Sequence, residues 1–374
     1  MVKELVVLRN KIDLLDTKLL KILAKRLALV KKIGIVKNIY GLPVYIPERE
    51  KYLIESKKKE AQKIGISPYL IEDILNRIIY ESYLNEKEKG FKKLNPNFKK
   101  ILIIGGKGKM GNLFRKMLIM SGYIVNILDK RDWENNDNIN NLFLNVEMII
   151  ISVPISSFND VISKLPILSK NCILIDVTSI KNMPMKKMLE KHKGPVLGLH
   201  PMFSPENNIL ARQLILYCNG RNPESYHWFL KQMQIWGVKL QCINSIEHDN
   251  YMAFIQSLRY FTTLVYGFFL LKQNIKLKKL LMFSTPIYYI DLILLGKFFS
   301  QDSKLYTEII MSSHNNIKNI KKYLHNINYI FSLIKKGNKA EIINIFNKVK
   351  ILFKNHILYS KIECDKILRY INNN

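Results

Sequence analysis

The stretch that decides the fold runs from residue 101 to residue 111 and reads ILIIGGKGKMG. Its four apolar residues, Ile101–Ile104, are typical of a parallel strand that is buried on both faces. The glycines that follow match the pattern G-x-G-x-x-G at Gly106, Gly108 and Gly111, and a helical pattern begins behind them. A strand, a glycine turn and a helix in this order predict the first unit of a dinucleotide-binding domain.

The turn also predicts which groups contact the nucleotide. The first glycine permits the tight turn, the second lets the backbone approach a pyrophosphate, and the third lets the helix pack on the strand, with Met110 inside the turn. Asp129, at the end of the next strand, can accept a hydrogen bond from a ribose 2′-hydroxyl, which favours NAD over NADP. Lys130 and Arg131 keep NADP open, and a glycine turn without a nucleotide is the other alternative.

Further apolar runs extend the α/β pattern to about residue 245. Short strands are expected at 123–128, 148–153, 172–177, 196–199 and 214–217. Their alternation with helical segments predicts a doubly wound, Rossmann-like α/β domain over residues 99–245. The remaining residues, 246–374, show long helical periodicity with few turn signals, so we expect an all-α C-terminal domain there.

The first 90 residues read as three helices and form a separate all-α domain, followed by a polar, basic linker at 91–98. Apolar residues recur at helical spacing from residue 1 to about 39, and turn signals at 41–43 and 65–68 separate the three helices. A 39-residue helix spans about 58 Å at 1.5 Å per residue. That length is too great for a compact monomer of this size, so we expect a homodimer.

Composition excludes several classes of protein. Hydrophobic residues make up 48% of the 374, which rules out wholesale disorder. The 4 cysteines are scattered without a C-x-x-C pair, so we expect no disulfide framework, no metal site and a reducing, cytoplasmic environment. The charged N-terminus is unlike a signal peptide, and the most apolar stretch, 280–299, contains Pro286, Asp291 and Lys297, which argues against a membrane span.

The net charge of +29, from 59 Lys and Arg against 30 Asp and Glu, raises the question of a nucleic-acid partner. The lysines are spread along the whole chain rather than focused in a patch. A diffuse basic field suits small anionic substrates, so we expect no nucleic acid and keep a basic nucleic-acid-binding protein as the alternative.

Two sets of residues now point to a family. The three-helix N-terminus resembles the all-helical chorismate mutases in carrying Arg9, Arg26, Lys37, Arg49, Glu50 and Ser82. The glycine turn, the segment GLHPMF at 198–203 and the helical tail resemble prephenate dehydrogenases. Fused in this order over essentially the whole chain, the modules resemble the bifunctional chorismate mutase/prephenate dehydrogenases of tyrosine biosynthesis.

Helix spacing alone supports a mutase site less strongly than the resemblance does. Arg26 and Lys37 are 11 residues apart and point within about 20° of each other on a helix. Ser82 and Glu86 are an i, i+4 pair and share a face. Arg26 interrupts an apolar stretch, and a buried cation needs an anionic partner. An ordinary charged helix surface is the alternative for each of them.

The resemblance implies that chorismate rearranges to prephenate in a pericyclic step without metal or cofactor. Arg26, together with Arg9 from the partner chain, would hold the two substrate carboxylates with forked hydrogen bonds. Glu50 would fix the substrate hydroxyl, and Arg49 and Ser82 would complete the polar shell.

Two further residues would act on the breaking ether bond. Lys37 would donate to the ether oxygen, with Glu86 on its other side, where many relatives carry Gln. An ionised carboxylate would repel the developing negative charge. We therefore expect mutase activity to fall as the pH rises.

His200 is the candidate base of the second reaction. It ends a strand on the side where such sheets bind ligands, and a neutral imidazole can accept a hydroxyl proton; a core or surface histidine is the alternative. By the resemblance, His200 polarises the ring 4-hydroxyl of prephenate while hydride leaves for NAD and CO2 is lost, which gives 4-hydroxyphenylpyruvate. Ser179 would orient His200 or the hydroxyl, unless it is a helix N-cap, and Ser152 and Pro154 would line the nicotinamide.

The tail departs from the family pattern. Lys297 stands where relatives usually place an arginine for the prephenate carboxylate, and lysine keeps the charge but loses the bidentate fork. Tyr260, beside Arg259, stands where relatives often have histidine, which puts inhibition by tyrosine in doubt. Lys181 is a weaker candidate for substrate contact. A chain in which only the mutase is efficient, and arogenate in place of prephenate, both stay open.

Overall fold

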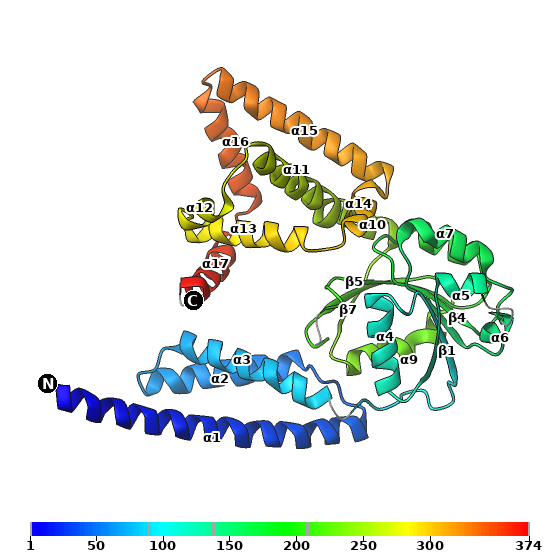
Figure 1. Ribbon diagram of the computed structural model, residues 1–374, viewed down its shortest axis with the longest axis horizontal. Helices are drawn as coiled ribbons and strands as arrows, with labels where there is room; N and C mark the ends of the chain where they lie inside the picture. The colour runs from blue at the N-terminus through cyan, green and yellow to red at the C-terminus, as the bar shows by residue number, and fades with distance from the viewer. Residues whose placement is uncertain (1, 88–89, 136–138, 207–209, 373–374) are drawn as a thin grey trace. The chain divides into compact units, whose positions relative to one another are not determined.

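The computed structural model describes residues 2–87, 90–135, 139–206 and 210–372 (Figure 1). The chain divides into two units, Met1–Ile246 and Glu247–Asn374. The first unit contains three N-terminal helices and a seven-stranded sheet with its helices, and the second is helical.

The N-terminal helices have the extents that the turn signals predict. They are α1 (Val2–Tyr40), α2 (Pro47–Lys63) and α3 (Pro68–Lys87). Gly41, after α1, adopts φ +66°, a left-handed conformation that glycine reaches without strain. Both later helices begin with a proline, whose missing N–H is not needed in the first turn.

The sheet has the strand order β2-β1-β3-β4-β5-β6-β7. Its strands are β1 (Lys100–Ile104), β2 (Ile124–Leu128), β3 (Met148–Ile151), β4 (Ile173–Asp176), β5 (Val196–Pro201), β6 (Leu214–Asn219) and β7 (Lys239–Cys242). The first five are parallel, β6 is antiparallel to β5, and β7 is parallel to β6. The sequence did not predict β7, because Lys239, Gln241 and Cys242 do not form an apolar run.

Alternate residues of each strand enter two cores, one on each face of the sheet. Ile101 and Ile103 belong to the core under α4 (Lys109–Met120) and α9 (His227–Ile235). Leu102 belongs to the opposite core, whose helices are α7 (Ile155–Lys164) and α8 (Asn182–Lys191). Shorter helices complete the connections: α5 (Lys130–Asn135), α6 (Ile139–Phe143) and the 3-10 turn η1 (Pro223–Tyr226).

The N-terminal helices share a core with the sheet domain. Val44 and Tyr83 are buried in the same cluster as Ile235, and the Val44 amide donates to the Ile235 carbonyl at 3.1 Å. The segment 91–98 is packed as well: Phe91 is buried, and the Phe98 ring lies 4.7 Å from the ring of Trp228. The first unit is therefore one packed body.

The second unit consists of helices that expose much of their apolar surface. After α10 (Ser245–Met252) and a π-helical stretch, η2 (Ala253–Leu258), come α11 (Arg259–Lys272), α12 (Leu277–Met282), α13 (Pro286–Phe299), α14 (Ser303–Met311), α15 (His314–Lys335), α16 (Lys339–Leu352) and α17 (Ile357–Asn372). Leu292, Ile309 and Leu333 are buried, whereas Phe254 and Phe268 stay more than half exposed.

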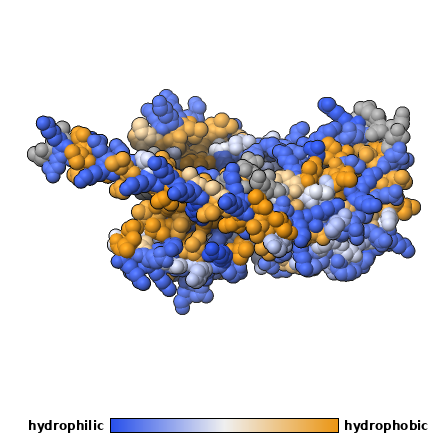
Figure 2. Space-filling view, turned by 90° about the horizontal axis from the view of Figure 1, so that it is seen from below, coloured by the Kyte–Doolittle hydropathy of each residue, from blue (hydrophilic) through white to orange (hydrophobic). Residues whose placement is uncertain are grey.

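Exposed apolar surface also marks α1, where orange patches alternate with blue ones toward the N-terminus in Figure 2. A second apolar segment is the continuous helical stretch Ser245–Lys272, which is long and apolar enough to cross a bilayer by length and composition alone. A single stretch of this kind is weak evidence for a membrane span.

Candidate active sites

The glycine turn lies between β1 and α4 and fits a dinucleotide phosphate. A Cβ at Gly106 would lie 2.4 Å from the Ile127 side chain, and one at Gly111 would lie 2.3 Å from the Gly105 carbonyl oxygen, so both positions need glycine. Gly108 is the N-cap of α4 and provides no side-chain cap. No side-chain cap therefore covers the start of this helix, where the helix dipole favours a phosphate.

Sequence reasoning missed Gly105, which precedes the motif. It adopts φ +82°, and a Cβ there would lie 2.2 Å from the Ser152 carbonyl oxygen. Ser152 itself follows β3, and its amide donates to the Ile104 carbonyl at 2.8 Å. Pro154, the exposed N-cap of α7, lies two residues further on. The predicted nicotinamide-side residues thus adjoin the glycine turn.

Asp129 follows β2 and is held against the turn. Its Oδ2 accepts a hydrogen bond from the Lys107 amide at 2.8 Å, so one carboxylate oxygen is fixed by the loop that would carry the pyrophosphate. Lys107 also pairs with Asp132 at 3.3 Å. Met110 is half-buried and packs against the core.

His200 is 3% exposed and lies near the end of β5. The last paired residue of β4, Asp176, faces Gly198, so His200 extends two residues beyond the end of β4. This is the carboxyl edge of the parallel strands, where open α/β sheets bind ligands.

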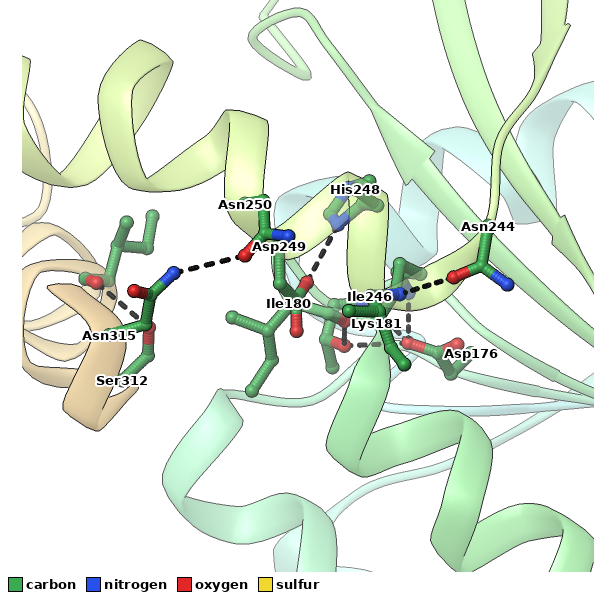
Figure 3. A network of polar contacts seen from close by, with 12 residues as sticks. Asp176, Ile180, Lys181, Asn244, Ile246, His248, Asp249, Asn250, Ser312 and Asn315 are labelled. Atoms are coloured by element: carbon green, nitrogen blue, oxygen red, sulfur yellow. Dashed lines mark hydrogen bonds and ion pairs between the residues drawn. The ribbon is translucent and has the colours of Figure 1, made fainter.

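A fully buried ion pair lies beside this edge. Lys181 and Asp176 are both completely buried, and the Lys181 ammonium contacts Asp176 Oδ2 (Figure 3). Thr178 Oγ1 donates to the same oxygen at 2.6 Å. A Cβ on Gly198 would lie 3.1 Å from Lys181 Cδ, so this glycine leaves the space that the pair occupies.

The pair has an electrostatic cost that its partners offset only in part. Burial raises the pKa of Asp176, while the Lys181 ammonium and the Thr178 hydrogen bonds oppose the rise. Asp176 Oδ1 has no hydrogen-bond partner among the described residues. Sequence reasoning considered Lys181 only as a substrate contact and missed Asp176, although a carboxylate after a buried strand was a signal.

Ser179 lies half-buried between β4 and α8. The N-cap residue of α8 is Lys181, and no side chain caps the helix. The alternative assignment of Ser179 as an N-cap is therefore wrong.

In the N-terminal helices, one predicted pair meets directly. Arg26 of α1 donates from Nη1 to Ser82 Oγ of α3 at 2.8 Å, and the buried Ser82 donates to the Ile78 carbonyl at 2.8 Å. Lys37, near the end of α1, donates to the Val44 carbonyl at 2.8 Å. The guanidinium is thus held by a buried hydroxyl, rather than lying loose on a helix surface.

Other predicted mutase residues lie apart from this pair or outside the description. Arg9 and Arg49 are exposed. Glu50, at the start of α2, binds Arg212, a residue that sequence reasoning missed because it lies far away in the chain. Glu86 belongs to α3, but its side chain lies outside the described part of the structure.

The remaining residues that the sequence singled out lie in the helical second unit. Lys297 of α13 is exposed. Tyr260 packs edge-on against Tyr306 with ring centroids 4.4 Å apart, and burial raises the pKa of Tyr260 to about 12.

His248, one of the histidines that sequence reasoning set aside, is buried, with Nδ1 2.8 Å from Asp249 Oδ1 (Figure 3). Among the described residues no cluster of His, Cys, Asp or Glu could hold a metal ion.

Comparison with protein families gives two matches on this chain. The family model described as chorismate mutase type II matches residues 8–87, which cover most of α1 to α3. The model described as the nucleotide-binding domain of prephenate dehydrogenase matches residues 127–217, from the end of β2 into β6.

Similar proteins extend over the entire chain. The T-protein of Enterobacter agglomerans is 48% identical over 372 residues, which cover 100% of this chain and 99% of that protein. The T-protein of Haemophilus influenzae is 44% identical over 344 residues, 92% of this chain and 90% of that protein. A crystal structure of prephenate dehydrogenase from A. aeolicus with hydroxyphenyl propionate and NAD+ is similar with a TM-score of 0.51 and 16% identity, over 69% of this chain and 98% of that one, which shows the shared fold.

Proposed function

The chain belongs to the T-protein family of bifunctional chorismate mutase/prephenate dehydrogenases, and from this membership we propose which of its residues carry the two reactions. It rearranges chorismate to prephenate and converts prephenate to 4-hydroxyphenylpyruvate and CO2 with NAD, in tyrosine biosynthesis. The observation that carries this conclusion is the 48% identity over the full length of the chain.

In the mutase reaction, the residues act by binding and electrostatics. Arg26, fixed by its 2.8 Å hydrogen bond to Ser82, holds one carboxylate of chorismate, and Arg9 of the partner subunit holds the other. Lys37 donates to the ether oxygen, where negative charge develops as the C–O bond breaks. Glu86 acts on the other side of that oxygen, Glu50 accepts a hydrogen bond from the substrate hydroxyl, and Arg49 and Ser82 complete the polar shell.

The assignment of Arg9 to a partner rests on helix geometry. Arg9 and Arg26 lie on one continuous helix, about 25 Å apart at 1.5 Å per residue. They cannot hold the same ligand in one copy of the chain. Two antiparallel α1 helices that cross midway between these residues would bring each Arg9 to the Arg26 of the other copy.

In the dehydrogenase reaction, most of the residues that bind the cofactor or act on the substrate come from the carboxyl edge of the parallel strands. The glycine turn and the start of α4 would hold NAD, Asp129 would accept a hydrogen bond from the adenosine ribose, and the bound cofactor would accept the hydride that leaves the ring carbon. His200 accepts the proton of the ring 4-hydroxyl as a carbonyl forms at that carbon, and loss of the ring carboxylate as CO2 leaves an aromatic ring. Ser179 orients His200 or the substrate hydroxyl, Ser152 and Pro154 border the nicotinamide, and Lys297 binds a carboxylate of the substrate.

The exposed apolar surfaces support a homodimer. On α1, Ile12 and Leu14 are 56% and 64% exposed, and on α11 Phe268 and Phe269 are each 55% exposed. Such patches mark contact surfaces in proteins. We propose that both meet a second copy of the chain rather than a bilayer or a nucleic acid. Free cysteines, with Cys172 and Cys218 buried, suit a reducing cytoplasm.

One assay tests both reactions. Purified chain is given chorismate alone, and the loss of chorismate absorbance is followed; NAD is then added, and NADH formation is measured. We expect chorismate to disappear without NAD and NADH to form only after its addition. No loss of chorismate would refute the mutase, and no NADH from added prephenate would refute the dehydrogenase; arogenate in a parallel cuvette separates the two possible substrates.

A further inference from the structure

One contact between the N-terminal helices and the sheet domain joins two charged side chains, those of Glu50 and Arg212. Arg212, which lies just before β6, donates from Nε to Glu50 Oε2 at 3.0 Å and also from Nη2 to the same oxygen. The Glu50 side chain is 14% exposed and that of Arg212 is 34% exposed. The ion pair is therefore largely shielded from water, and a charge-assisted contact of this kind restricts the carboxylate strongly.

Arg212 is also tied to α3. Its Nη2 lies 3.3 Å from Asn76 Oδ1, and its guanidinium lies 5.9 Å from the ring centre of Tyr83. Tyr83 follows Ser82, the residue that fixes Arg26. One guanidinium from the sheet domain thus contacts the start of α2 and one face of α3.

The backbone at Arg212 is unusual. It adopts φ +68°, in the left-handed region where glycine and asparagine are common and a long side chain is rare. Its amide donates to the Gly237 carbonyl at 3.1 Å, which fixes this turn. Strained backbone of this kind persists where the surrounding structure holds it, and it is concentrated at functional sites.

We propose that Arg212 is a positioning residue for the mutase reaction: the sheet domain fixes the Glu50 carboxylate that receives the substrate hydroxyl. Both hydrogen bonds end on Oε2, and no described residue donates to Oε1. In this proposal, Oε1 accepts a hydrogen bond from the hydroxyl of chorismate. This inference rests on the proposed role of Glu50, and it makes the mutase module dependent on a residue outside the three helices.

The test removes the guanidinium without disturbing the turn. Asparagine adopts positive φ readily, so Arg212→Asn keeps the backbone conformation while it removes both hydrogen bonds to Glu50. We expect mutase kcat/KM to fall about tenfold to a hundredfold, as misplacement of a catalytic group typically costs. Dehydrogenase activity on added prephenate should change less than about twofold, since Arg212 is not part of that site. Arg212→Lys should recover part of the mutase activity.

A matched control removes a different cation at the same contact. Lys239 of β7 places its ammonium 5.2 Å from the ring centre of Tyr45, which joins the same two parts of the chain without touching Glu50. Lys239→Ala should leave mutase kcat/KM near that of the original chain. An equal loss in both variants would overturn the proposal, because the effect would then come from packing between the modules.

A double-mutant cycle separates this inference from the role of Glu50. Glu50→Gln should lower mutase activity by itself, and in that background Arg212→Asn should add little, because Arg212 acts through the carboxylate. Additive losses would overturn the proposal. If Glu50→Gln has no effect, the assigned role of Glu50 fails; if Glu50→Gln is impaired while Arg212→Asn is fully active, only the inference about Arg212 fails.

Discussion

The central sheet and the N-terminal helix bury their apolar residues to opposite extents. In β3 all four residues, Met148–Ile151, are buried at 0% exposure, whereas along α1 Leu14 and Leu20 are 64% and 68% exposed. The sheet finds its packing partners within one chain, between two layers of helices. The long helix does not, which agrees with the proposal that a second copy of the chain completes the mutase site, whereas the proposed dehydrogenase residues of the sheet lie within one chain.

The largest expected effect tests the local character of the sheet edge. His200→Asn removes the proposed base near the end of β5 and should lower dehydrogenase kcat by about 10²- to 10⁴-fold, the usual contribution of a general base. Mutase activity should be unchanged, because His200 is not among the residues proposed for the mutase reaction. Stopped assays for both reactions on the same sample measure this, and a dehydrogenase within tenfold of normal would exclude His200 as the base.

The next prediction concerns the contribution of the buried Asp176–Lys181 pair to the free energy of unfolding. Asp176→Asn removes the carboxylate charge that contacts the fully buried Lys181 ammonium, and removing one partner of a buried pair typically costs about 3–5 kcal/mol of unfolding free energy. Urea denaturation gives this value directly.

The double variant Asp176→Asn/Lys181→Met is the control. It removes both charges, so it should be more stable than Asp176→Asn alone. An Asp176→Asn protein as stable as the original would contradict the prediction, because the buried Lys181 side chain would then not depend on the Asp176 carboxylate.

The contrast between sheet and helix also explains what the sequence could predict. Local signals carried the α/β domain: the run Ile101–Ile104, the glycines behind it and the alternation of strands and helices. They also gave the extents of the three N-terminal helices, because glycine and proline mark their ends.

Contacts that depend on the folded arrangement carried no such signal. Asp176 and Lys181 are five residues apart, yet only the fold brings both beneath Gly198. Arg212 and Glu50 are 162 residues apart, and nothing in either stretch points to the other. β7 was missed because an edge strand need not be apolar.

A third prediction asks whether α1 completes the mutase site of another chain. Arg9→Ala and Arg26→Ala should each lower mutase activity about a hundredfold, since each removes a forked carboxylate contact. If the two copies share their sites, unfolding and refolding an equal mixture of both variants should restore about a quarter of the original activity, because half of the dimers then contain one intact site.

The mixture result is specific to a shared site. Refolded Arg9→Ala alone is the control and should stay inactive. A mixture no more active than its components would mean that Arg9 serves the site of its own chain, or none, and the antiparallel arrangement of α1 would have to be abandoned.

The smallest effect concerns the helical unit, where substrate recognition is proposed to have weakened. Lysine at position 297 keeps a positive charge but offers no planar fork to a carboxylate, so the prephenate complex lacks one charge-assisted hydrogen bond. Lys297→Arg should therefore lower the KM for prephenate by about tenfold, the equivalent of 1–2 kcal/mol, with little change in kcat because the interaction is equally strong in the ground and transition states. Lys304→Arg, on the next helix, makes the same substitution where no substrate contact is assigned and should leave the KM unchanged. If both variants leave it unchanged, Lys297 does not bind the carboxylate, and another cation of the chain must do so.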